Sequence, residues 1–250
     1  MTTAKKQTTN NPSLSALLST KTAYQPFSVW LVGDTPLITH AWSEKAKREM
    51  LGKQVGATKS GREPRDPKAD FVSSLYEMGD KKFGFPVTGV KNCIMSAAHK
   101  DKGLPRTVVQ AALWLDAEMV AIRPALAGAM CDMPLVRIWG SAPVMREDMT
   151  RIGGGISKTA TLAYRPQFSV WAMKIRGKFN ATLLKPDALA FIIQESGVTS
   201  GLGEWRNERK GIFGAFHLAD ATEEEAWDKF TAGKGEMPTP RTSYEIGEVA

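Results

Sequence analysis

The sequence predicts an α+β domain whose strands and helices follow the order βαββαβ. Two segments rich in β-forming residues, Gln25–His40 and Thr161–Phe179, are each followed later in the chain by an amphipathic helical pattern. A short apolar segment, Phe213–Leu218, closes the folded part. This order is that of the ferredoxin-like fold, the scaffold on which RRM-like sheets bind RNA. We therefore expect a four-stranded sheet backed by two helices, with the first and third strands side by side.

The first half of the chain supplies the first strand and a short helix. Gln25–His40 begins as a strand, and the turn-forming run Gly33–Pro36 breaks it. Ser43 is a favourable N-cap for a helix over Glu44–Leu51, which Gly52 ends. These signals predict a strand, a break and a helix within thirty residues of Gln25.

Two further helices carry the pattern expected of core elements. The helical alternation of Val90–His99 places Lys91 in its first turn, where a helix N-terminus favours a phosphate. A plain surface lysine is the alternative interpretation of Lys91. Pro186 suits the first position of a helix that continues to Ser196 with one apolar face.

The sequence between these two helices is typical of an inserted hairpin. Leu135–Trp139 and Val144–Ile152 read as two strands joined by the turn Gly140–Pro143. We expect this hairpin to protrude from the domain and to present basic side chains. Those side chains are Arg137, Arg146 and Arg151.

The composition divides the chain into three parts. Residues 1–24 are polar and predict a flexible N-terminal arm, and residues 25–220 form the α+β domain, with an insertion at about 100–160. Residues 221–250 predict a short acidic helix, Thr222–Phe230, followed by a polar tail.

Charge and cysteine content narrow the function classes. Hydrophobic residues make up 42% of the chain, and 33 Lys and Arg against 26 Asp and Glu give a net charge of +7. Such an excess fits a polyanionic partner. Cys93 and Cys131 lack the spacing of a zinc site, and we expect no metal or other cofactor. With no long apolar run and no signal peptide pattern, we expect a cytoplasmic protein without a membrane partner.

The most informative segment is the glycine-rich stretch Gly197–Phe216. Glycines admit unusual backbone angles and let a phosphate or another backbone come close, and an indole gives a base a flat face on which to stack. One interpretation is an ordinary loop between a helix and a strand, and the other is a loop that binds a nucleic-acid backbone. The glycines are Gly201, Gly203, Gly211 and Gly214, and they bracket Trp205, Arg206, Arg209 and Lys210.

Three stretches resemble motifs of the RAMP superfamily, whose repeated backbone subunit coats guide RNA in CRISPR effector complexes. Gly201–Gly214 is similar to the closing glycine-rich loop of that family. Phe85–Asn92 resembles its proline, small-residue and lysine motif, although Val87 and Asn92 stand where the family usually has glycine. Gly33–Ile38 resembles the loop that bears a target-cleaving aspartate in some members.

The resemblance covers Gln25–Ala219 in patches, and within it Leu135–Ile152 corresponds to the thumb-like insertion of the family. The chain is also similar to small proteins encoded by bacterial viruses, which implies a phage-encoded or bacterial distant member in a bacterial cytoplasm. The resemblance implies a non-catalytic protein that binds single-stranded RNA or DNA and forms a homo-oligomeric filament along it. Trp205 or Trp139 would stack against bases, and the basic loop would contact phosphates.

Two other functions remain open from the sequence. An endoribonuclease of this scaffold would use Asp34 or His40. The His40 imidazole titrates near neutrality and can act as a general base, whereas Asp34 would position a metal or the attacking 2′-hydroxyl. A structural role for both residues is the alternative. A viral inhibitor or decoy that mimics a subunit of a host RNA-guided complex is the third candidate. Its acidic helix would contact a neighbouring subunit.

Overall fold

The computed structural model describes residues 24–56, 66–101, 104–121, 132–152 and 159–239. Within these residues the chain forms a mixed α+β fold with two antiparallel sheets and six α-helices. The strands are β1 (Tyr24–Gly33), β2 (Leu37–Ile38), β3 (Phe83–Pro86), β4 (Leu113–Leu115), β5 (Glu118–Ala121), β6 (Asp132–Gly140), β7 (Val144–Ile152), β8 (Thr159–Phe168), β9 (Trp171–Asn180) and β10 (Phe216–Leu218). The helices are α2 (Glu44–Gln54), α3 (Pro67–Ser73), α4 (Val87–Asp101), α5 (Arg106–Ala112), α6 (Pro186–Thr199) and α7 (Ala221–Thr231).

The larger sheet is organised around the long antiparallel pair β1 and β9. Its strand order is β10-β1-β9-β6-β3, with β4 also paired to β9 and β5 to β6. The register places Pro26 opposite Lys178 and Trp30 opposite Lys174. Because successive side chains alternate between faces, residues opposite one another lie on the same face. Trp30 and Lys174 therefore share one face of the sheet, and the residues next to them in each strand lie on the other face.

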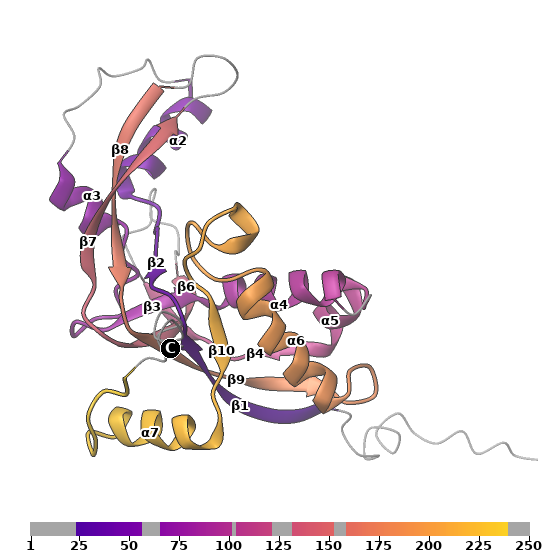
Figure 1. Ribbon diagram of the computed structural model, residues 1–250. Coiled ribbons are helices and arrows are strands. Elements are labelled where there is room, and N and C mark those ends of the chain that lie inside the picture. The colour runs from indigo at the N-terminus through magenta and orange to yellow at the C-terminus, as the bar shows by residue number, and fades with distance from the viewer. Residues whose placement is uncertain (1–23, 57–65, 102–103, 122–131, 153–158, 240–250) are drawn as a thin grey trace, which may run out of the picture.

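One face of this sheet packs against α4 and α6 (Figure 1). Leu31 of β1 and Met173 and Ile175 of β9 are fully or almost fully buried there, with Ile192 of α6. Helix α6 packs directly against β10 because it has a glycine at position 197, where an added Cβ would lie 1.7 Å from the carbonyl oxygen of Phe216. The main core therefore lies between the sheet and these two helices.

The opposite face of the same sheet is only partly covered, by α7. Trp227 of α7 is 1% exposed and stacks on Trp30, with ring centroids 5.8 Å apart. Val32 and Ala172 complete this second, smaller apolar cluster. The acidic helix at the end of the sequence is therefore packed on the sheet through its one tryptophan.

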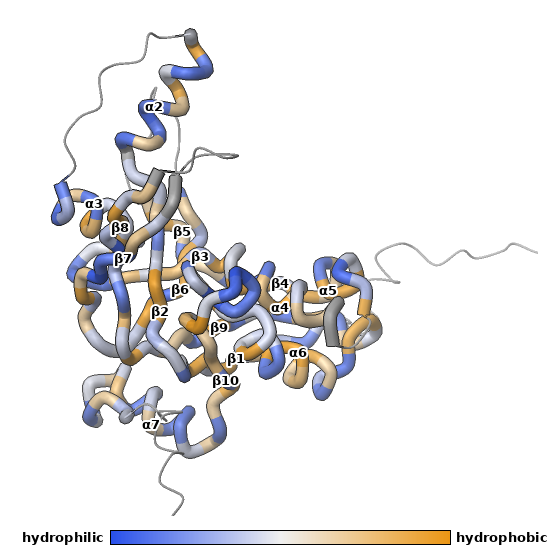
Figure 2. The backbone as a smooth tube through the Cα atoms, turned by 45° about the horizontal axis from the view of Figure 1, so that its top comes forward, coloured by the Kyte–Doolittle hydropathy of each residue, from blue (hydrophilic) through white to orange (hydrophobic). Residues whose placement is uncertain are grey.

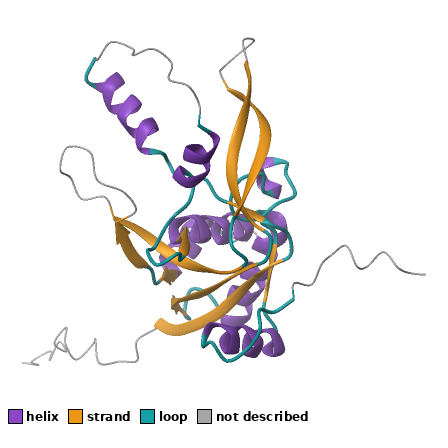
Figure 3. Cartoon of the chain, turned by 90° about the vertical axis from the view of Figure 1, so that its left-hand side faces the viewer, coloured by secondary structure: helices purple, strands orange, loops and turns teal. Residues whose placement is uncertain are grey.

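The second sheet contains β7 and β8, which form a long hairpin that projects away from the main sheet (Figure 3). β2 pairs with the last two residues of β8, and α3 lies beside β8. Helix α2 is rich in hydrophilic residues (Figure 2).

The predicted hairpin of Leu135–Trp139 with Val144–Ile152 is wrong. β6 pairs with β3, β5 and β9, whereas β7 pairs with β8. The reason lies at the turn between β6 and β7, where the amide of Ser141 donates to the carbonyl of Val170 at 2.9 Å. The Ser141 hydroxyl accepts from the amide of Val170 at 3.1 Å. The turn after β6 is thus bound to the bend between β8 and β9. As a result, β7 and β8 extend outward side by side as the projecting hairpin.

The predicted helices form, and most are longer than expected. Glu44–Leu51 extends to Gln54 in α2, and Thr222–Phe230 gains one residue at each end in α7. Val90–His99 begins three residues earlier, at Val87. The predicted strand Thr161–Phe179 is two strands, β8 and β9, which meet at a bend. Residues 1–23 of the predicted arm and 240–250 of the predicted tail lie outside the described residues.

Candidate nucleic-acid interface

A cavity of about 600 Å³ brings together Phe85–Asn92 and the glycine-rich loop, two segments that the sequence singles out. The first turns of α4 form one wall, and the glycine-rich loop forms the facing wall. A helix N-terminus presents amide groups that can face an anionic group, while the carboxylates of Glu204 and Glu208 line the same cavity. The cavity lining includes Thr88, Asn92, Ser96, His40, Glu204 and Glu208.

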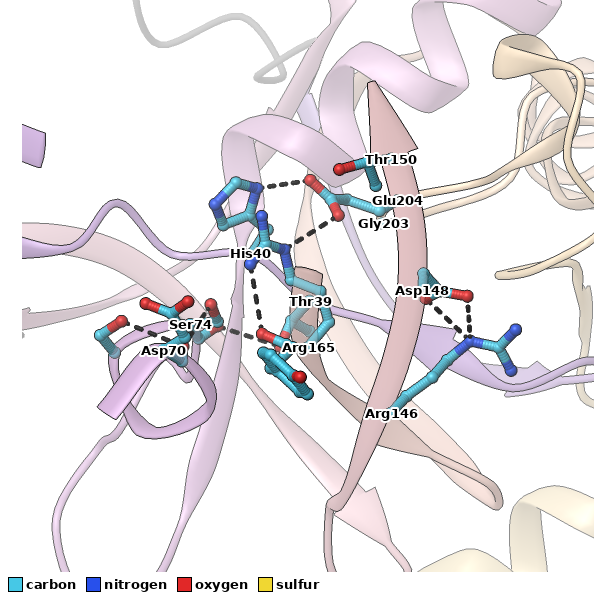
Figure 4. Close-up of polar contacts among 12 residues, drawn as sticks. Thr39, His40, Asp70, Ser74, Arg146, Asp148, Thr150, Arg165, Gly203 and Glu204 are labelled. Carbon is cyan, nitrogen blue, oxygen red and sulfur yellow. Dashed lines mark hydrogen bonds and ion pairs between the residues drawn. The ribbon is translucent and has the colours of Figure 1, made fainter. Parts of the chain in front are cut away.

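Glu204 links the loop to the segment after β2. Its carboxylate binds the Nδ1 atom of His40 and accepts from Nε of Arg165 of β8 at 3.2 Å, as Figure 4 shows. Burial alone would raise the pKa of Glu204, but the hydrogen bonds and charges of His40 and Arg165 outweigh it and lower this pKa. Glu204 is therefore an anion that holds His40 at the cavity wall.

Asp34 lies in a different cluster, away from the cavity lining. Its carboxylate binds Nδ1 of His217 at 2.6 Å, and Nε2 of His217 faces Glu223 of α7 at 3.1 Å. This places Asp34 and His40, the two candidate catalytic residues, in separate hydrogen-bonded clusters.

The basic centre of the glycine-rich loop is partly engaged by the loop itself. Arg206 donates to Glu208 at 3.0 Å and to the carbonyl of Gly203 at 3.0 Å. Glu208 also accepts from the hydroxyl of Ser96 at 2.8 Å. These contacts engage the Arg206 guanidinium within its own loop, so Arg206 acts first to hold the shape of the loop.

The other predicted side chains of this loop are exposed. Arg209 and Lys210 belong to the surface, and Trp205 is 40% exposed. Trp205 and Lys210 have φ angles of 54° and 63°, which place both in the left-handed region. The loop therefore presents an indole and two cations from a tightly constrained backbone.

The glycines of this loop are required by its own packing. An added Cβ at Gly203 would lie 2.3 Å from the carbonyl oxygen of Ile38, and one at Gly211 would lie 1.7 Å from that of Trp205. At Gly214 the clash is with the carbonyl oxygen of Leu202, at 1.8 Å. Gly201 adopts a φ of +68°. Glycine at these positions is explained without any bound phosphate.

Lys91 occupies a different position from the one predicted. Because α4 begins at Val87, Lys91 lies in its second turn and outside the cavity lining. Its ammonium group donates to the carbonyl of Gln110 in α5 at 3.3 Å. In this structure Lys91 connects two helices.

The predicted arginines of the insertion are distributed over two sheets. Arg146 of β7 donates to Asp148 at 2.9 Å and to Gln167 at 3.0 Å, and its guanidinium lies over the ring of Phe213. Arg146 thereby joins the hairpin to the glycine-rich loop at Phe213. Arg151 lies near the end of β7, and its side chain is outside the described residues.

The open face of the larger sheet carries a row of cations that the sequence analysis missed. Lys174, Arg176 and Lys178 occupy alternate positions of β9, while Ile175, between the first two, packs into the core on the opposite face. Alternate residues of a strand are about 6.7 Å apart, so the three charges form a regular line. The period-two pattern of cations in an otherwise apolar strand was the sequence signal for this row.

Exposed aromatic rings lie beside this row. Trp114 of β4 is directly opposite Lys178 and is 60% exposed, and Tyr24 of β1 is 44% exposed. The Lys178 ammonium lies 6.0 Å and 5.9 Å from the centroids of these two rings. Cations alternating with exposed rings are the arrangement by which sheets bind single-stranded nucleic acids.

Arg137 and Trp139 of β6 extend the same face. Trp139 is opposite Ala172 of β9, and the Arg137 guanidinium lies 3.3 Å from the centroid of the Trp139 ring. Burial lowers the pKa of Arg137, and the charge of Glu118 opposes this shift. The Nε atom of Arg137 is buried without a hydrogen-bond partner among the described residues. Two residues predicted for a hairpin thus lie on the sheet.

The His217 cluster predicts a pH-dependent stability. The hydrogen bond to Asp34 raises the pKa of His217, burial opposes this, and the charges of Asp34 and Glu223 add to the rise. The folded state therefore binds a proton more tightly than the unfolded chain. Its stabilisation is complete below about pH 6.5, the ordinary histidine pKa, and is lost as pH rises through the raised pKa.

We expect the melting temperatures of the parent protein and of His217→Gln to differ most at about pH 6 and to converge at about pH 9. Differential scanning fluorimetry across this range measures the difference. A difference that is constant with pH would show that His217 contributes no proton-linked stability.

The sequence matches no known protein-family model and none of the curated proteins with which it was compared. Within the described part of the chain, no helix combines the length and apolar character needed to cross a bilayer. The same residues contain no group of three or more His, Cys, Asp or Glu side chains arranged to hold a metal ion.

Proposed function

We propose that this protein binds single-stranded nucleic acid, RNA or DNA, without catalysis, on the open face of its larger sheet. The cation row of β9 carries the proposal, because its exposed members Arg176 and Lys178 lie beside exposed rings and suit a flexible polyanion with stackable bases. The net charge of +7 has the sign that such a ligand requires.

The strand order supports a ferredoxin-like core for this surface. β10, β1, β9 and β4 lie side by side and antiparallel, and α4 and α6 cover one face. With β1, α4, β4, β9, α6 and β10 taken in sequence, the order is βαββαβ. In that fold the uncovered face of the sheet is the one on which RRM-like domains bind RNA.

The glycine-rich loop and the cavity would contact a neighbouring part of the same ligand. Arg209 and Lys210 offer charges, and Trp205 offers a ring. The α4 N-terminus in the cavity wall adds amide groups suited to a phosphate. Arg206 would serve this surface indirectly, by fixing the shape of the loop.

The RAMP resemblance adds a proposal about assembly. Copies of the protein would line up along one strand, forming a homo-oligomer whose size grows with the length of the oligonucleotide. Size-exclusion chromatography with light scattering, at several oligonucleotide lengths, measures this. A host RNA-guided complex is the alternative partner, and binding to it without added nucleic acid would favour the decoy role.

Binding itself is tested by fluorescence anisotropy with labelled oligo(dT) and oligo(rU) of about 15 nucleotides, a length within reach of such a sheet. We expect the affinity to fall steeply between about 50 and 200 mM salt, since phosphate contacts release counterions. Absence of binding to either probe at the lower salt concentration would contradict the proposal.

One observation favours an endoribonuclease as second candidate. His40 lies at the wall of the cavity with Glu204 on its Nδ1 atom, which leaves the other ring nitrogen to act on a 2′-hydroxyl. Cleavage of labelled RNA by the parent protein, and its loss in His40→Gln, would establish this candidate. Uncut RNA after prolonged incubation would remove it.

A further inference from the structure

Helix α7 covers one end of the open sheet face with two adjacent residues of opposite character. Trp227 stacks on Trp30 with the ring planes 29° apart. The next residue, Asp228, accepts from the Lys174 ammonium at 2.5 Å and from Nε1 of Trp30 at 2.9 Å. A flat ring and an anion thus occupy the positions above an aromatic ring and a lysine.

A nucleotide offers the same two features, a flat ring in its base and a negative charge on its phosphate. Lys174 is the first member of the cation row, and its ammonium lies 5.4 Å from the centroid of the Trp30 ring. The hydrogen bond from Lys174 lowers the pKa of Asp228, so the carboxylate is charged and competes directly for this lysine. Arg176 also acts on Asp228 through its charge.

We propose, building on the function proposed above, that Trp30 and Lys174 form a further base-and-phosphate subsite, which α7 closes in the free protein. Bound nucleic acid displaces Trp227 and Asp228 and lengthens the contacted row from Arg176 and Lys178 to Lys174. Helix α7 is then an internal competitor that weakens binding to the rest of the face.

The packing allows α7 to leave without disturbing the main core. Trp227 belongs to the small cluster with Trp30, Val32 and Ala172, against which Phe230 and Trp139 also pack, and this cluster is separate from the larger core under α4 and α6. The N-terminus of α7 stays attached to β10 through the contact of Glu223 with His217. Elements held by few apolar contacts open at lower free-energy cost than the core.

The test compares two variants that each remove one acidic charge from α7. Asp228→Asn frees Lys174 and keeps an oxygen acceptor for Trp30, whereas Glu225→Gln changes an exposed residue paired only with Lys229 within the helix. We expect Asp228→Asn to bind labelled oligo(dT) about fivefold more tightly than Glu225→Gln does, because closure by one partly exposed ion pair is weakened. Adding Lys174→Gln should abolish this gain.

Hydrogen–deuterium exchange of the full-length protein gives a second measurement. Saturating oligo(dT) should increase exchange at the α7 amides of residues 225–231 and leave those of α6 unchanged. If the parent protein binds the oligonucleotide, α7 keeps its protection and the two variants have equal affinity, the inference is overturned while the binding function stands. If neither the parent protein nor any variant binds, the proposed function itself fails.

Discussion

Replacing Arg176 and Lys178 together by glutamine is expected to weaken oligo(dT) binding by about 30-fold at roughly 0.1 M salt, which corresponds to about 2 kcal/mol. Both side chains are exposed on the open face, so their loss should leave the core intact. The slope of log K against log salt should also become shallower by about 1.4, since each phosphate contact to a single strand contributes about 0.7. Anisotropy titrations at several salt concentrations measure both effects.

The matched control removes the same amount of charge from another part of the protein. Lys53 of α2 and Lys68 of α3 are exposed and lie on helices outside the larger sheet (Figure 1). Because screening limits long-range effects, Lys53→Gln with Lys68→Gln should change the affinity by less than about twofold. An equal loss in both double variants would mean that net charge, rather than the sheet face, determines binding.

Gly214→Ala is expected to destabilise the protein by about 4 kcal/mol, which lowers Tm by about 10 °C for a chain of this size. Gly214 has a φ of +69°, and an added Cβ would lie 1.8 Å from the Leu202 carbonyl oxygen. The same residue donates to Pro36 and accepts from the amide of Leu202, each at 2.9 Å. An alanine must therefore separate two backbone segments that hydrogen-bond each other.

Gly79 separates the two causes of this loss. Its φ is +81°, but nothing lies within 4 Å of an added Cβ. Gly79→Ala should cost only the left-handed backbone term, about 1 kcal/mol. Thermal melts without ligand compare the two variants. If Gly214→Ala melts like the parent protein and loses only oligonucleotide binding, the glycine serves the ligand instead of the loop.

The elements with strong local signals could be predicted from the sequence. Ser43 accepts from the amide of Ala46 as the N-cap of α2, and Pro186 occupies the first position of α6. The pairing of the strand after Gln25 with the later apolar strand is also confirmed, since β1 pairs with β9. Caps, helix-opening prolines and apolar strands act through nearby residues, which a single sequence displays.

The partner of β7 could not be predicted in the same way. A run such as Gly140–Pro143 between two strands is the ordinary signal of a hairpin. The structure overrides it through a contact between residues far apart in sequence, the mutual hydrogen bonds of Ser141 with Val170. Strand pairing of this kind depends on tertiary contacts that local patterns do not encode.

The candidate site was predicted in part. The glycine-rich loop and the Phe85–Asn92 segment do meet at one cavity, but Lys91 contacts α5 and Arg206 is engaged by its own loop. Side-chain partners such as Gln110 and Glu208 decide these outcomes. The alternation of cations with other residues in β9 is visible in the sequence. Only the fold shows that the opposite face of β9 is buried, which leaves the cations on the open face.

Photocrosslinking tests the central proposal most directly. A single-stranded oligonucleotide that carries 5-iodouracil, irradiated with the protein and mapped by mass spectrometry of the peptides, identifies the rings on which bases stack. The open sheet face predicts crosslinks at Trp114 and Tyr24. Crosslinks confined to residues outside this face, such as those of the β7–β8 hairpin, or no complex at low salt, would contradict it.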